Sequence, residues 1–305
     1  MSIAILLCTK NGESFINEQL YSIRNQNIEN IDLYILDNKS SDNTLKIVKN
    51  FSEQNKKVNV FIFDGCDLHF ANSYLELAKM ITNQYEYYAF CDQDDIWMKN
   101  HLSRGIKCID NIASSKPSLF CSRTTLINEV GHLIGKSQRF LKKPSFKNAL
   151  VQSIAGANTM IFNKKAFELF LMANIKKKIV SHDWLLYIFV SGSEGNIIYD
   201  QIPSVLYRQH DRNIIGTNRG IFNKAKRIYM VIRGIYNEYN MLNFYQIDGF
   251  DLLSENNKKV YKLYKESVLG KNLFKLQNLF ASGVYRQSFS GQLALFLSVF
   301  IKSRR

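Results

Sequence analysis

The sequence predicts an α/β protein, with a mostly parallel sheet flanked by helices and a helical region at the C-terminal end. Three observations predict this class. Strand and helix signals alternate regularly through the first 110 residues, as they do in βαβ units. From Phe222 onward the pattern is helical, with little strand signal. The 305 residues, of which 46% are hydrophobic and 22% charged, are sufficient to bury a sizeable core.

Unbroken apolar runs predict strands that are covered on both faces. In the first 110 residues these runs are Ile3–Leu7, Ile31–Leu36, Val58–Phe63 and Tyr87–Cys91. Each run is followed by apolar residues spaced three and four apart, which is the period of an amphipathic helix. The helical stripes are Ile16, Leu20 and Ile23; Leu45, Val48 and Phe51; Phe70, Tyr74, Leu77 and Ile81; and Leu102, Ile106 and Ile109.

Residues 118–210 combine the two signals less regularly. We expect strands at Leu119–Ile127, Thr159–Phe162 and Ile197–Tyr207, and helices at Lys165–Ala173 and Asp183–Val190. We place a boundary in the Gly- and Asn-containing stretch 215–220. The predicted domains are therefore residues 1–216 and a basic, mainly helical region of residues 217–305.

Composition excludes several classes of protein. Three prolines and fifteen glycines exclude collagen-like and Pro/Gly-rich disordered chains. No apolar run reaches the roughly 18 residues of a membrane-spanning helix, and the N-terminus lacks the basic start and cleavage site of a signal peptide. The five cysteines are odd in number and lack CxxC spacing, so we expect buried thiols in a reducing, cytoplasmic protein.

The net charge of +14 is concentrated in the C-terminal third. Residues 1–211 carry 24 Lys and Arg against 21 Asp and Glu, whereas residues 212–305 carry 16 against 5. The stretches 224–236 and 292–305 combine basic and apolar residues, which is typical of helices in peripheral contact with an anionic membrane. We favour helices that pack on the first domain, with membrane contact as an added role, and a homodimer interface is the alternative. We expect no nucleic-acid partner, because no RNA- or DNA-binding motif is present.

The strongest local signal for chemistry is Asp92-Gln93-Asp94-Asp95, which directly follows a buried strand. Ligands of parallel sheets bind beyond the carboxyl ends of the strands. Three carboxylates this close repel one another, and a hard divalent cation, Mg²⁺ or Mn²⁺, would relieve the repulsion and also hold substrate phosphates. The alternative is a solvated acidic turn that caps a helix at Ile96.

Two acidic residues elsewhere are further candidates. Asp37 ends the second strand, where a carboxylate can accept a hydrogen bond from a nucleobase N–H or a ribose hydroxyl. The Ser, Asp and Thr residues after it are ordinary helix-capping residues. Asp183 opens a predicted helix, where it is either favoured by the helix dipole or placed to act as a general base.

The last strand of the first domain ends in Tyr207-Arg208-Gln209-His210. This group offers several hydrogen-bond donors to a diphosphate, and a neutral histidine can ligate a metal. The alternative is the exposed end of a surface strand. Other chemistries lack their motifs, since the chain has no GxGxxG or GxxxxGK[ST] phosphate loop, no GxSxG elbow and no HExxH.

Taken in order, these signals resemble glycosyltransferase family 2, inverting enzymes with the Rossmann-like type-A glycosyltransferase fold. The motifs that carry the resemblance are AILLCTKNGESFINEQLYSI, LDNKSSDNT, DQDDIW, HDW and YRQH. The continuation YRQHDRNIIG is similar to the bacterial rhamnosyltransferase-like branch, which builds O-antigen and capsular polysaccharides. The resemblance covers about residues 1–216 and is more specific for fold and reaction than for the sugar.

The resemblance implies a role for each matching residue. Asp183 would be the catalytic base, and Asp94 with His210 would bind the divalent metal. Asp92 and Asp94 would form the family's DxD pair. The nucleotide-sugar donor would be bound by Thr9, Asn11, Glu13, Asp37, Asn38, Asn72, Asp92, Gln93, Asp95, Arg208 and His210. We expect acceptor specificity around residues 156–159 and 131–147.

Two positions depart from the commoner family pattern. Asn38 replaces the second Asp of the nucleotide motif, which puts the ribose contacts in doubt. His182 stands where many relatives have Glu before the base, and the rhamnosyltransferase branch often has His there. The resemblance therefore implies an inverting transferase of a deoxysugar such as L-rhamnose from a dTDP donor to a saccharide or polyprenyl-diphosphate-linked acceptor. The alternatives are a UDP-hexose transferase of the same fold and a non-catalytic scaffold that binds nucleotide sugars.

Overall fold

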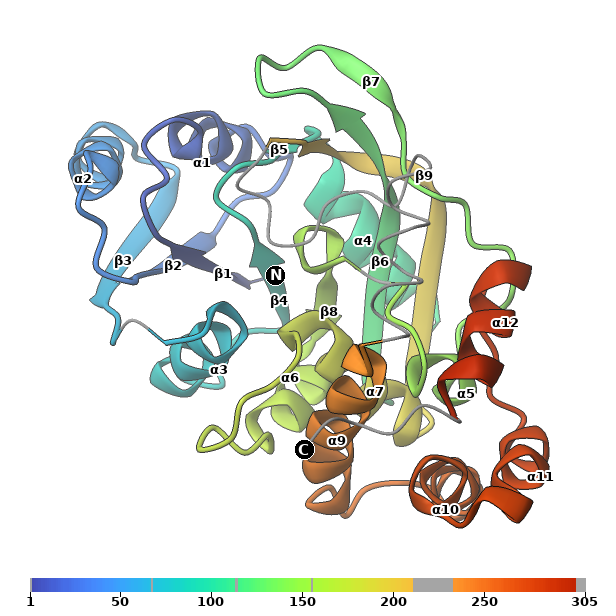
Figure 1. Cartoon of the computed structure of the whole chain (residues 1–305). Coiled ribbons are helices and arrows are strands. Elements are labelled where there is room, and N and C mark those ends of the chain that lie inside the picture. The colour runs from blue at the N-terminus through green and yellow to red at the C-terminus, as the bar shows by residue number, and fades with distance from the viewer. Residues whose placement is uncertain (1, 67, 113–114, 155, 211–232, 300–305) are drawn as a thin grey trace.

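The computed structural model describes residues 2–66, 68–112, 115–154, 156–210 and 233–299. The strands in these residues are β1 (Ile3–Thr9), β2 (Ile31–Asp37), β3 (Val58–Asp64), β4 (Tyr87–Cys91), β5 (Ile96–Trp97), β6 (Ser118–Ile127), β7 (Leu133–Lys136), β8 (Ile161–Asn163) and β9 (Asn196–Arg208). They form one sheet in the order β3-β2-β1-β4-β8-β6-β9-β5, with β7 paired to β6 (Figure 1).

Helices follow most of these strands. They are α1 (Ile16–Arg24), α2 (Thr44–Gln54), α3 (Phe70–Met80), α4 (His101–Asp110), α5 (Phe146–Ala149), α6 (Lys164–Leu171) and α7 (His182–Gly192), with a short 3-10 helix η1 (Ala157–Thr159). The C-terminal helices are α9 (Ile235–Asp248), α10 (Glu255–Leu269), α11 (Asn272–Ser282) and α12 (Phe289–Ser298). The prediction of an α/β class with a helical C-terminal region is confirmed.

The sheet is mixed rather than uniformly parallel. β3, β2, β1 and β4 are parallel neighbours, and so are β6 and β9. Between these two groups the short strand β8 runs antiparallel to both β4 and β6. Only three residues form β8, so its direction depends on long-range pairing that the local pattern does not report.

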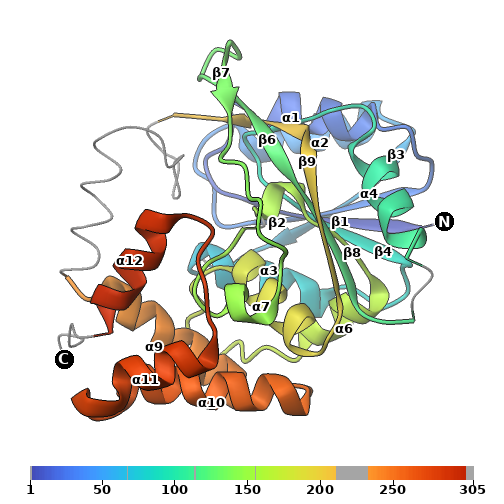
Figure 2. The same ribbon diagram turned by 90° about the vertical axis from the view of Figure 1, so that its right-hand side faces the viewer.

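The two faces of the sheet are covered by different helices. Along β1, Ile3, Ile5 and Leu7 pack on the side of α1, α2 and α4, whereas Ala4 and Leu6 pack on the side of α3, α6 and α7. Figure 2 shows the sheet nearly edge-on between these two layers. Burial on both faces explains why the strands are continuous apolar runs.

The structure around Ile96 differs from the alternative prediction, in which an acidic turn caps a helix at Ile96. No helix begins there in the described chain; instead Ile96 and Trp97 form β5 and pair with Leu206 and Val205 of β9. The helix α4 starts only at His101. The acidic segment at 92–95 is therefore held between β4 and a strand pair and does not cap a helix at Ile96.

The C-terminal helices share a hydrophobic core with the first domain. Phe250, after α9, stacks on Phe189 of α7 with ring centroids 4.1 Å apart. The Ser254 N–H also donates to the carbonyl oxygen of Gly192 at 3.1 Å. The predicted boundary at 215–220 and most of the stretch 224–236 lie outside the described residues. Among the helices that are described, none is both long and apolar enough to cross a bilayer.

Candidate active site

The carboxyl ends of the central strands meet at one edge of the sheet, because these strands are parallel and in register. Thr9 of β1 lies opposite Asp37 of β2, and Leu7 lies opposite Cys91 at the end of β4. A cavity of about 770 Å³ opens at this edge, within the size range of small-molecule sites. Its lining also includes residues from the start of α7, from the end of β9, and at positions 137, 138, 140, 154 and 156–159.

The predicted site residues divide into two groups. Those that line the cavity are Thr9, Asn11, Asn38, Asp92, Gln93, Asp94, Asp183 and His210. The remaining predicted residues lie outside this lining: Glu13, Asp37, Asn72, Asp95 and Arg208. Both segments expected to contact the acceptor contribute to the cavity wall, through Ser137, Gln138 and Phe140 and through residues 156–159.

Two buried carboxyl groups in the cavity have strongly raised pKa values. Burial, followed by the charges of Asp94 and Asp183, raises the pKa of Asp92 to about 7. Burial also raises the pKa of Asp183 to about 7, although its carboxylate accepts hydrogen bonds from the Trp184 N–H at 2.7 Å and from the Ser181 hydroxyl. Perturbed carboxyl groups that share a cavity are typical of active sites.

Asp94 and His210 form a direct pair in the same cavity. The Oδ2 atom of Asp94 lies 2.9 Å from Nε2 of His210. The His210 ring stacks on Phe15, with centroids 5.0 Å apart. This stacking fixes the plane of the imidazole beside the carboxylate. The pair joins the loop after β4 to the end of β9, 116 residues further along the chain.

Gln93 joins the loop after β1 to the loop after β4. Its Oε1 accepts hydrogen bonds from the Thr9 hydroxyl at 2.6 Å and from the Lys10 N–H at 3.0 Å. Its Nε2 donates to the Lys10 carbonyl oxygen at 3.2 Å. A Cβ atom at Gly12 would lie only 2.5 Å from Gln93 Oε1. Glycine at position 12 therefore permits this close approach of the two loops.

Arg208 and Asp95 lie behind the cavity and support the acidic loop. The Arg208 guanidinium is 2% exposed; it donates to the Asp94 carbonyl oxygen at 3.0 Å, to the Glu129 carbonyl oxygen at 2.6 Å and to the Glu18 carboxylate. The Asp95 carboxylate accepts from the Arg208 N–H at 3.0 Å and from the Asn158 amide. The Arg208 side chain therefore faces oxygen atoms of the protein. The sequence predicts that it faces a diphosphate.

The acidic residues of the first two loops bind the loops themselves. Asp37 accepts from the Ser40 N–H at 2.9 Å and from its hydroxyl at 2.6 Å, and Glu13 accepts from the Asn43 N–H at 2.9 Å. Asn11 has a positive φ of 49°, and its side-chain Oδ1 accepts from the Ser41 N–H at 2.8 Å. These bonds explain why Asp37 and Glu13 shape the cavity rim without lining it.

Asn72 holds the loop that leads into α7, the helix that carries Asp183. Its amide donates to the carbonyl oxygens of Lys177 at 3.0 Å and Ile175 at 3.3 Å, and its oxygen accepts from the Ile179 N–H at 3.3 Å. All three partners belong to the loop between α6 and α7. Asn72 therefore holds this loop and lies outside the lining of the cavity.

Tyr74 and His182 also line the cavity, although no sequence pattern marks them as site residues. The Tyr74 hydroxyl donates to the Cys91 carbonyl oxygen at 2.7 Å and lies 3.2 Å from Asp92 Oδ1. The His182 ring stacks on Tyr74, with centroids 3.7 Å apart, and burial lowers its pKa to about 3. Tyr74 belongs to an apolar helical stripe, so nothing in the spacing distinguished it from a core residue. His182 was noted only as a departure from the family pattern.

The chemistry of the donor set fits a divalent cation that has few protein ligands. Within the described residues, no group of three or more His, Cys, Asp or Glu side chains is arranged to hold a metal ion. The adjacent Asp94 and His210 offer two ligands, and Asp92 adds negative charge nearby. Mg²⁺ is commonly held by one or two carboxylates together with substrate phosphates, which is the arrangement that these residues allow.

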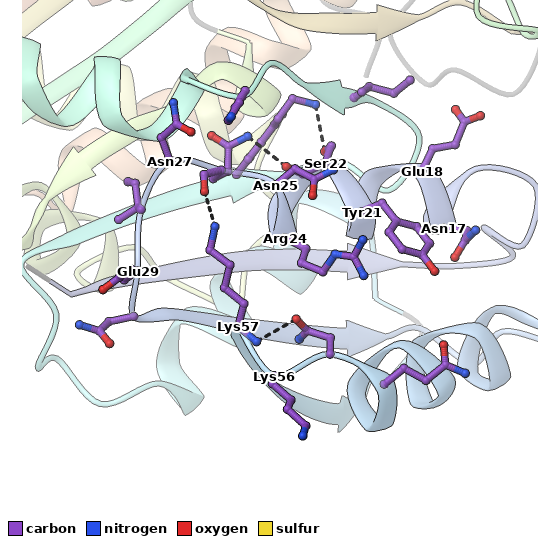
Figure 3. Close-up of a pocket in the computed structure, with 18 residues that line it drawn as sticks. Asn17, Glu18, Tyr21, Ser22, Arg24, Asn25, Asn27, Glu29, Lys56 and Lys57 are labelled. Carbon is purple, nitrogen blue, oxygen red and sulfur yellow. Dashed lines mark hydrogen bonds between the residues drawn. The ribbon is translucent and has the colours of Figure 1, made fainter.

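A second, larger hollow lies along α1 and has a different character. Its volume is about 1620 Å³, and Figure 3 shows that asparagine, lysine and other polar side chains line it. Several of these groups already have protein partners: Lys57 donates to the Gln26 carbonyl oxygen, and Arg24 lies over the Tyr21 ring at 4.5 Å. The hollow brings together no set of buried carboxyl groups like that of the smaller cavity.

Comparisons with known proteins identify the family and the fold. The chain is 31% identical over 238 residues to the dTDP-rhamnosyl transferase RfbG of Shigella flexneri, which covers 74% of this chain and 78% of that protein. Its fold is similar to that of S. aureus TarS in complex with UDP-GlcNAc, with a TM-score of 0.57, 16% identity, and coverage of 92% and 79%. It is also similar to the mannosyltransferase PcManGT of Pyrobaculum calidifontis in complex with GDP-Man and Mn²⁺, with a TM-score of 0.55, 14% identity, and coverage of 97% and 72%.

The sequence model of glycosyl transferase family 2 matches residues 4–175. This match begins in β1, includes the loops after β1, β2 and β4, and ends shortly before α7. The resemblance inferred from the motifs is thus confirmed, and so is the type-A glycosyltransferase fold. The chain belongs to glycosyltransferase family 2.

Proposed function

We propose that this protein is a metal-dependent, inverting glycosyltransferase that moves L-rhamnose from dTDP-rhamnose to a saccharide acceptor. The acceptor would be a polysaccharide or a lipid-linked saccharide, as in the assembly of O-antigen or capsule in the cytoplasm. One observation carries the proposal: Asp92, Asp94 and Asp183 lie in one cavity with His210. The identity of 31% to a protein named dTDP-rhamnosyl transferase supports this sugar and nucleotide.

The donor nucleotide would lie against the loops after β1 and β2. Thr9, Asn11 and Asn38 line the cavity on that side. The Asn38 side chain is also fixed by α3, because its amide donates to the Ser73 hydroxyl at 3.0 Å. Glu13, Asp37 and Asn72 would act on the donor indirectly, by fixing the loops that carry or face these lining residues.

Asp94 and His210 would hold a divalent metal, Mn²⁺ or Mg²⁺, together with the donor diphosphate. Bound there, the metal would neutralise charge that develops on the leaving diphosphate. The two side chains are already paired at 2.9 Å, so little rearrangement is needed to present both. The Mn²⁺ in the complex of the fold neighbour PcManGT supports a divalent metal as the cofactor.

Asp183 would act as the catalytic base. As the acceptor oxygen attacks the anomeric carbon, its proton passes to the Asp183 carboxylate, and the bond to the diphosphate breaks on the opposite face. The electrons of that bond leave with the nucleoside diphosphate, so one displacement inverts the anomeric configuration. A pKa of about 7 suits a base that must both accept and release a proton near neutrality.

The second candidate is a UDP-hexose transferase of the same fold. The complex of TarS with UDP-GlcNAc favours it, because that neighbour shares the fold over 92% of this chain. A non-catalytic scaffold is less well supported, since both members of the DxD pair and the base position retain their carboxyl groups in the cavity.

Calorimetric titration with dTDP, UDP, GDP, CDP and their common sugars, with and without Mn²⁺, tests the donor site. We expect metal-dependent binding of dTDP-rhamnose that is lost in Asp94→Ala. The matched control is Asp251→Ala, which removes an exposed carboxylate after α9. Preferential binding of a UDP-sugar would favour the second candidate. Absence of nucleotide binding under every condition would contradict both transferase proposals.

A further inference from the structure

α12 presents a row of apolar side chains to solvent. Phe289, Leu293 and Leu297 are spaced four residues apart and therefore lie on one face of the helix. Their exposed fractions are 87%, 52% and 56%. The opposite face is buried through Leu295 and Ser298. An exposed apolar row on a helix that is otherwise packed is typical of a protein- or membrane-interaction surface.

α11 extends the same apolar surface. Phe280 is 65% exposed, and its ring lies 5.1 Å from that of Phe296 on α12. We refer to Phe280, Phe289, Leu293 and Leu297 as the apolar face. It belongs to two helices that are otherwise anchored in the shared core through Leu279 and Leu295. The apolar face is thus anchored to the rest of the protein through the shared core.

A basic segment of the catalytic domain lies next to the helices of the apolar face. Residues 136–147 contain five basic residues and no acidic residue. The exposed basic side chains are Lys136, Arg139, Lys142, Lys143 and Lys147. Most of this segment is the chain between β7 and α5, which runs beside the connection from α11 to α12 in Figure 2.

Direct hydrogen bonds join the basic segment to the residues that lead into α12. The Lys142 N–H donates to Gln287 Oε1 at 3.0 Å, and Lys142 Nζ donates to the Arg286 carbonyl oxygen at 2.9 Å. The Tyr285 hydroxyl donates to the Lys143 carbonyl oxygen. Phe289 follows these residues almost at once. The basic segment and the start of the apolar face are therefore fixed to each other.

We propose that the apolar face and the basic segment 136–147 together form a docking surface for an anionic lipid bilayer. Phenylalanine and leucine side chains would enter the boundary between headgroups and acyl chains, while the lysines would lie among anionic headgroups. Nucleic acid does not match the apolar face. A second copy of the chain would bring two basic segments together, and their like charges would repel.

The docking surface adjoins the cavity of the candidate active site. Ser137, Gln138 and Phe140 line that cavity and belong to the basic segment itself. A protein docked in this way would hold the acceptor side of the cavity near the bilayer, where a lipid-linked saccharide emerges. This consequence rests on the proposed function, whereas the docking itself does not.

Co-sedimentation with vesicles tests the docking surface. The full-length protein is mixed with vesicles of phosphatidylcholine alone, or of equal parts phosphatidylcholine and phosphatidylglycerol. We expect binding to the anionic vesicles only. The charge reversals Lys136→Glu and Lys143→Glu together should weaken it roughly thirtyfold or more, since each basic residue near such a surface contributes about fivefold. Phe289→Ser with Leu293→Ser should weaken it roughly tenfold or more.

Matched substitutions elsewhere on the surface provide the controls. Lys46→Glu with Lys49→Glu removes two exposed lysines of α2, and Met80→Ser removes an exposed apolar side chain at the end of α3. These variants should bind vesicles as the unmodified protein does. Donor titration of every variant shows separately whether the fold and the candidate active site remain intact.

Three outcomes would overturn the proposal. The first is no binding of the unmodified protein to anionic vesicles. The second is equal binding by the docking variants and the controls. The third is a dimer in sedimentation velocity that Phe289→Ser with Leu293→Ser converts to a monomer, because a second copy of the chain would then cover the apolar face. None of them depends on whether sugar transfer is detected, so docking and transfer are tested independently.

Discussion

The aspartates of the cavity are held in an environment that opposes their ionisation. Burial brings the pKa values of Asp92 and Asp183 to about 7, and the charges of Asp94 and Asp183 contribute to the shift of Asp92. A donor diphosphate adds more negative charge. A bound cation therefore has a physical role even before catalysis, because it offsets the repulsion between protein and substrate.

The raised pKa values make stability depend on pH. Between about pH 4 and pH 7 the folded protein keeps protons on Asp92 and Asp183 that the unfolded chain has released, so the free energy of unfolding falls as the pH rises. Asp183→Asn removes one of these groups. We expect it to raise the free energy of unfolding at pH 8 by up to about 4 kcal/mol and to change it little at pH 4.

Urea denaturation of the metal-free protein at the two pH values measures this effect. Asp251→Asn, at an exposed carboxylate, is the matched control and should change neither value appreciably. Equal stabilities of Asp183→Asn and the unmodified protein at pH 8 would show that burial does not raise the pKa of Asp183.

Arg208 illustrates a residue that supports a site without lining it. Its guanidinium is buried among the Asp94 and Glu129 carbonyl oxygens and the Glu18 carboxylate. Arg208→Lys keeps the charge but cannot reach all these acceptors, and unsatisfied buried groups are costly. We expect a loss of about 3 kcal/mol in the free energy of unfolding.

Arg104→Lys is the control for Arg208→Lys, because Arg104 pairs with Asp200 at a less buried position, 24% exposed. Its effect should stay below about 1 kcal/mol. Thermal unfolding of both variants compares them directly. A loss of stability no larger in Arg208→Lys than in Arg104→Lys would contradict the supporting role of the guanidinium.

Between elements, the site depends on the contact of the loops after β1 and β4. Gly12→Ala would place its Cβ atom 2.5 Å from Gln93 Oε1 and so displace the side chain that joins the two loops. We expect a loss of about 1–2 kcal/mol in stability and weaker donor binding. Gln93→Ala removes the obstacle, so Gly12→Ala should cost much less in that background.

A double-mutant cycle on positions 12 and 93, measured by urea denaturation and donor titration, isolates this coupling. Gly249→Ala is the control, since a Cβ atom there would have its nearest neighbour at an ordinary 3.8 Å. Additive effects of the substitutions at 12 and 93 would show that the two loops are not coupled through this contact.

The strands and helices of the first 110 residues were largely predictable from the sequence. Buried parallel strands and amphipathic helices leave different periods in the sequence, and the predicted runs match β1 to β4 and α1 to α4 closely. The direction of β8 and the existence of β5 were not predictable, because both depend on pairing with strands far along the chain.

The candidate site was predictable in its position but not in the direction of each side chain. Motif order correctly brings Asp92, Asp94, Asp183 and His210 to one cavity. The sequence does not report that Arg208 turns inward, or that Asp37 is bound by Ser40. Tyr74 shares the spacing of core residues, so only its hydroxyl contacts near Asp92 distinguish it.

In the whole molecule, the C-terminal helices and the first domain depend on each other for burial. Phe250 stacks on Phe189 of α7, the helix that begins beside Asp183. Phe250→Ala should therefore destabilise the whole protein by about 3 kcal/mol while leaving a single unfolding transition. Leu252→Ala, at a half-exposed neighbouring position, is the control. Two separate transitions in circular dichroism would instead indicate independent domains.

The same connection places the base of the candidate reaction at the junction of the two parts. α7 carries Asp183 at its start and packs against both the sheet and the C-terminal helices. Displacement of these helices should consequently alter catalysis as well as stability. The docking surface belongs to the same arrangement, because the residues that lead into α12 are bonded to the segment that lines the cavity.

Asp183→Asn shows whether this cavity transfers a sugar with Asp183 as the base. Donor affinity and the rate of sugar transfer are measured on the same preparation, by calorimetry and by release of nucleoside diphosphate in the presence of acceptor. We expect donor affinity to change less than about threefold while the transfer rate falls by at least about a thousandfold. Transfer by Asp183→Asn at the rate of the unmodified protein would exclude Asp183 as the catalytic base.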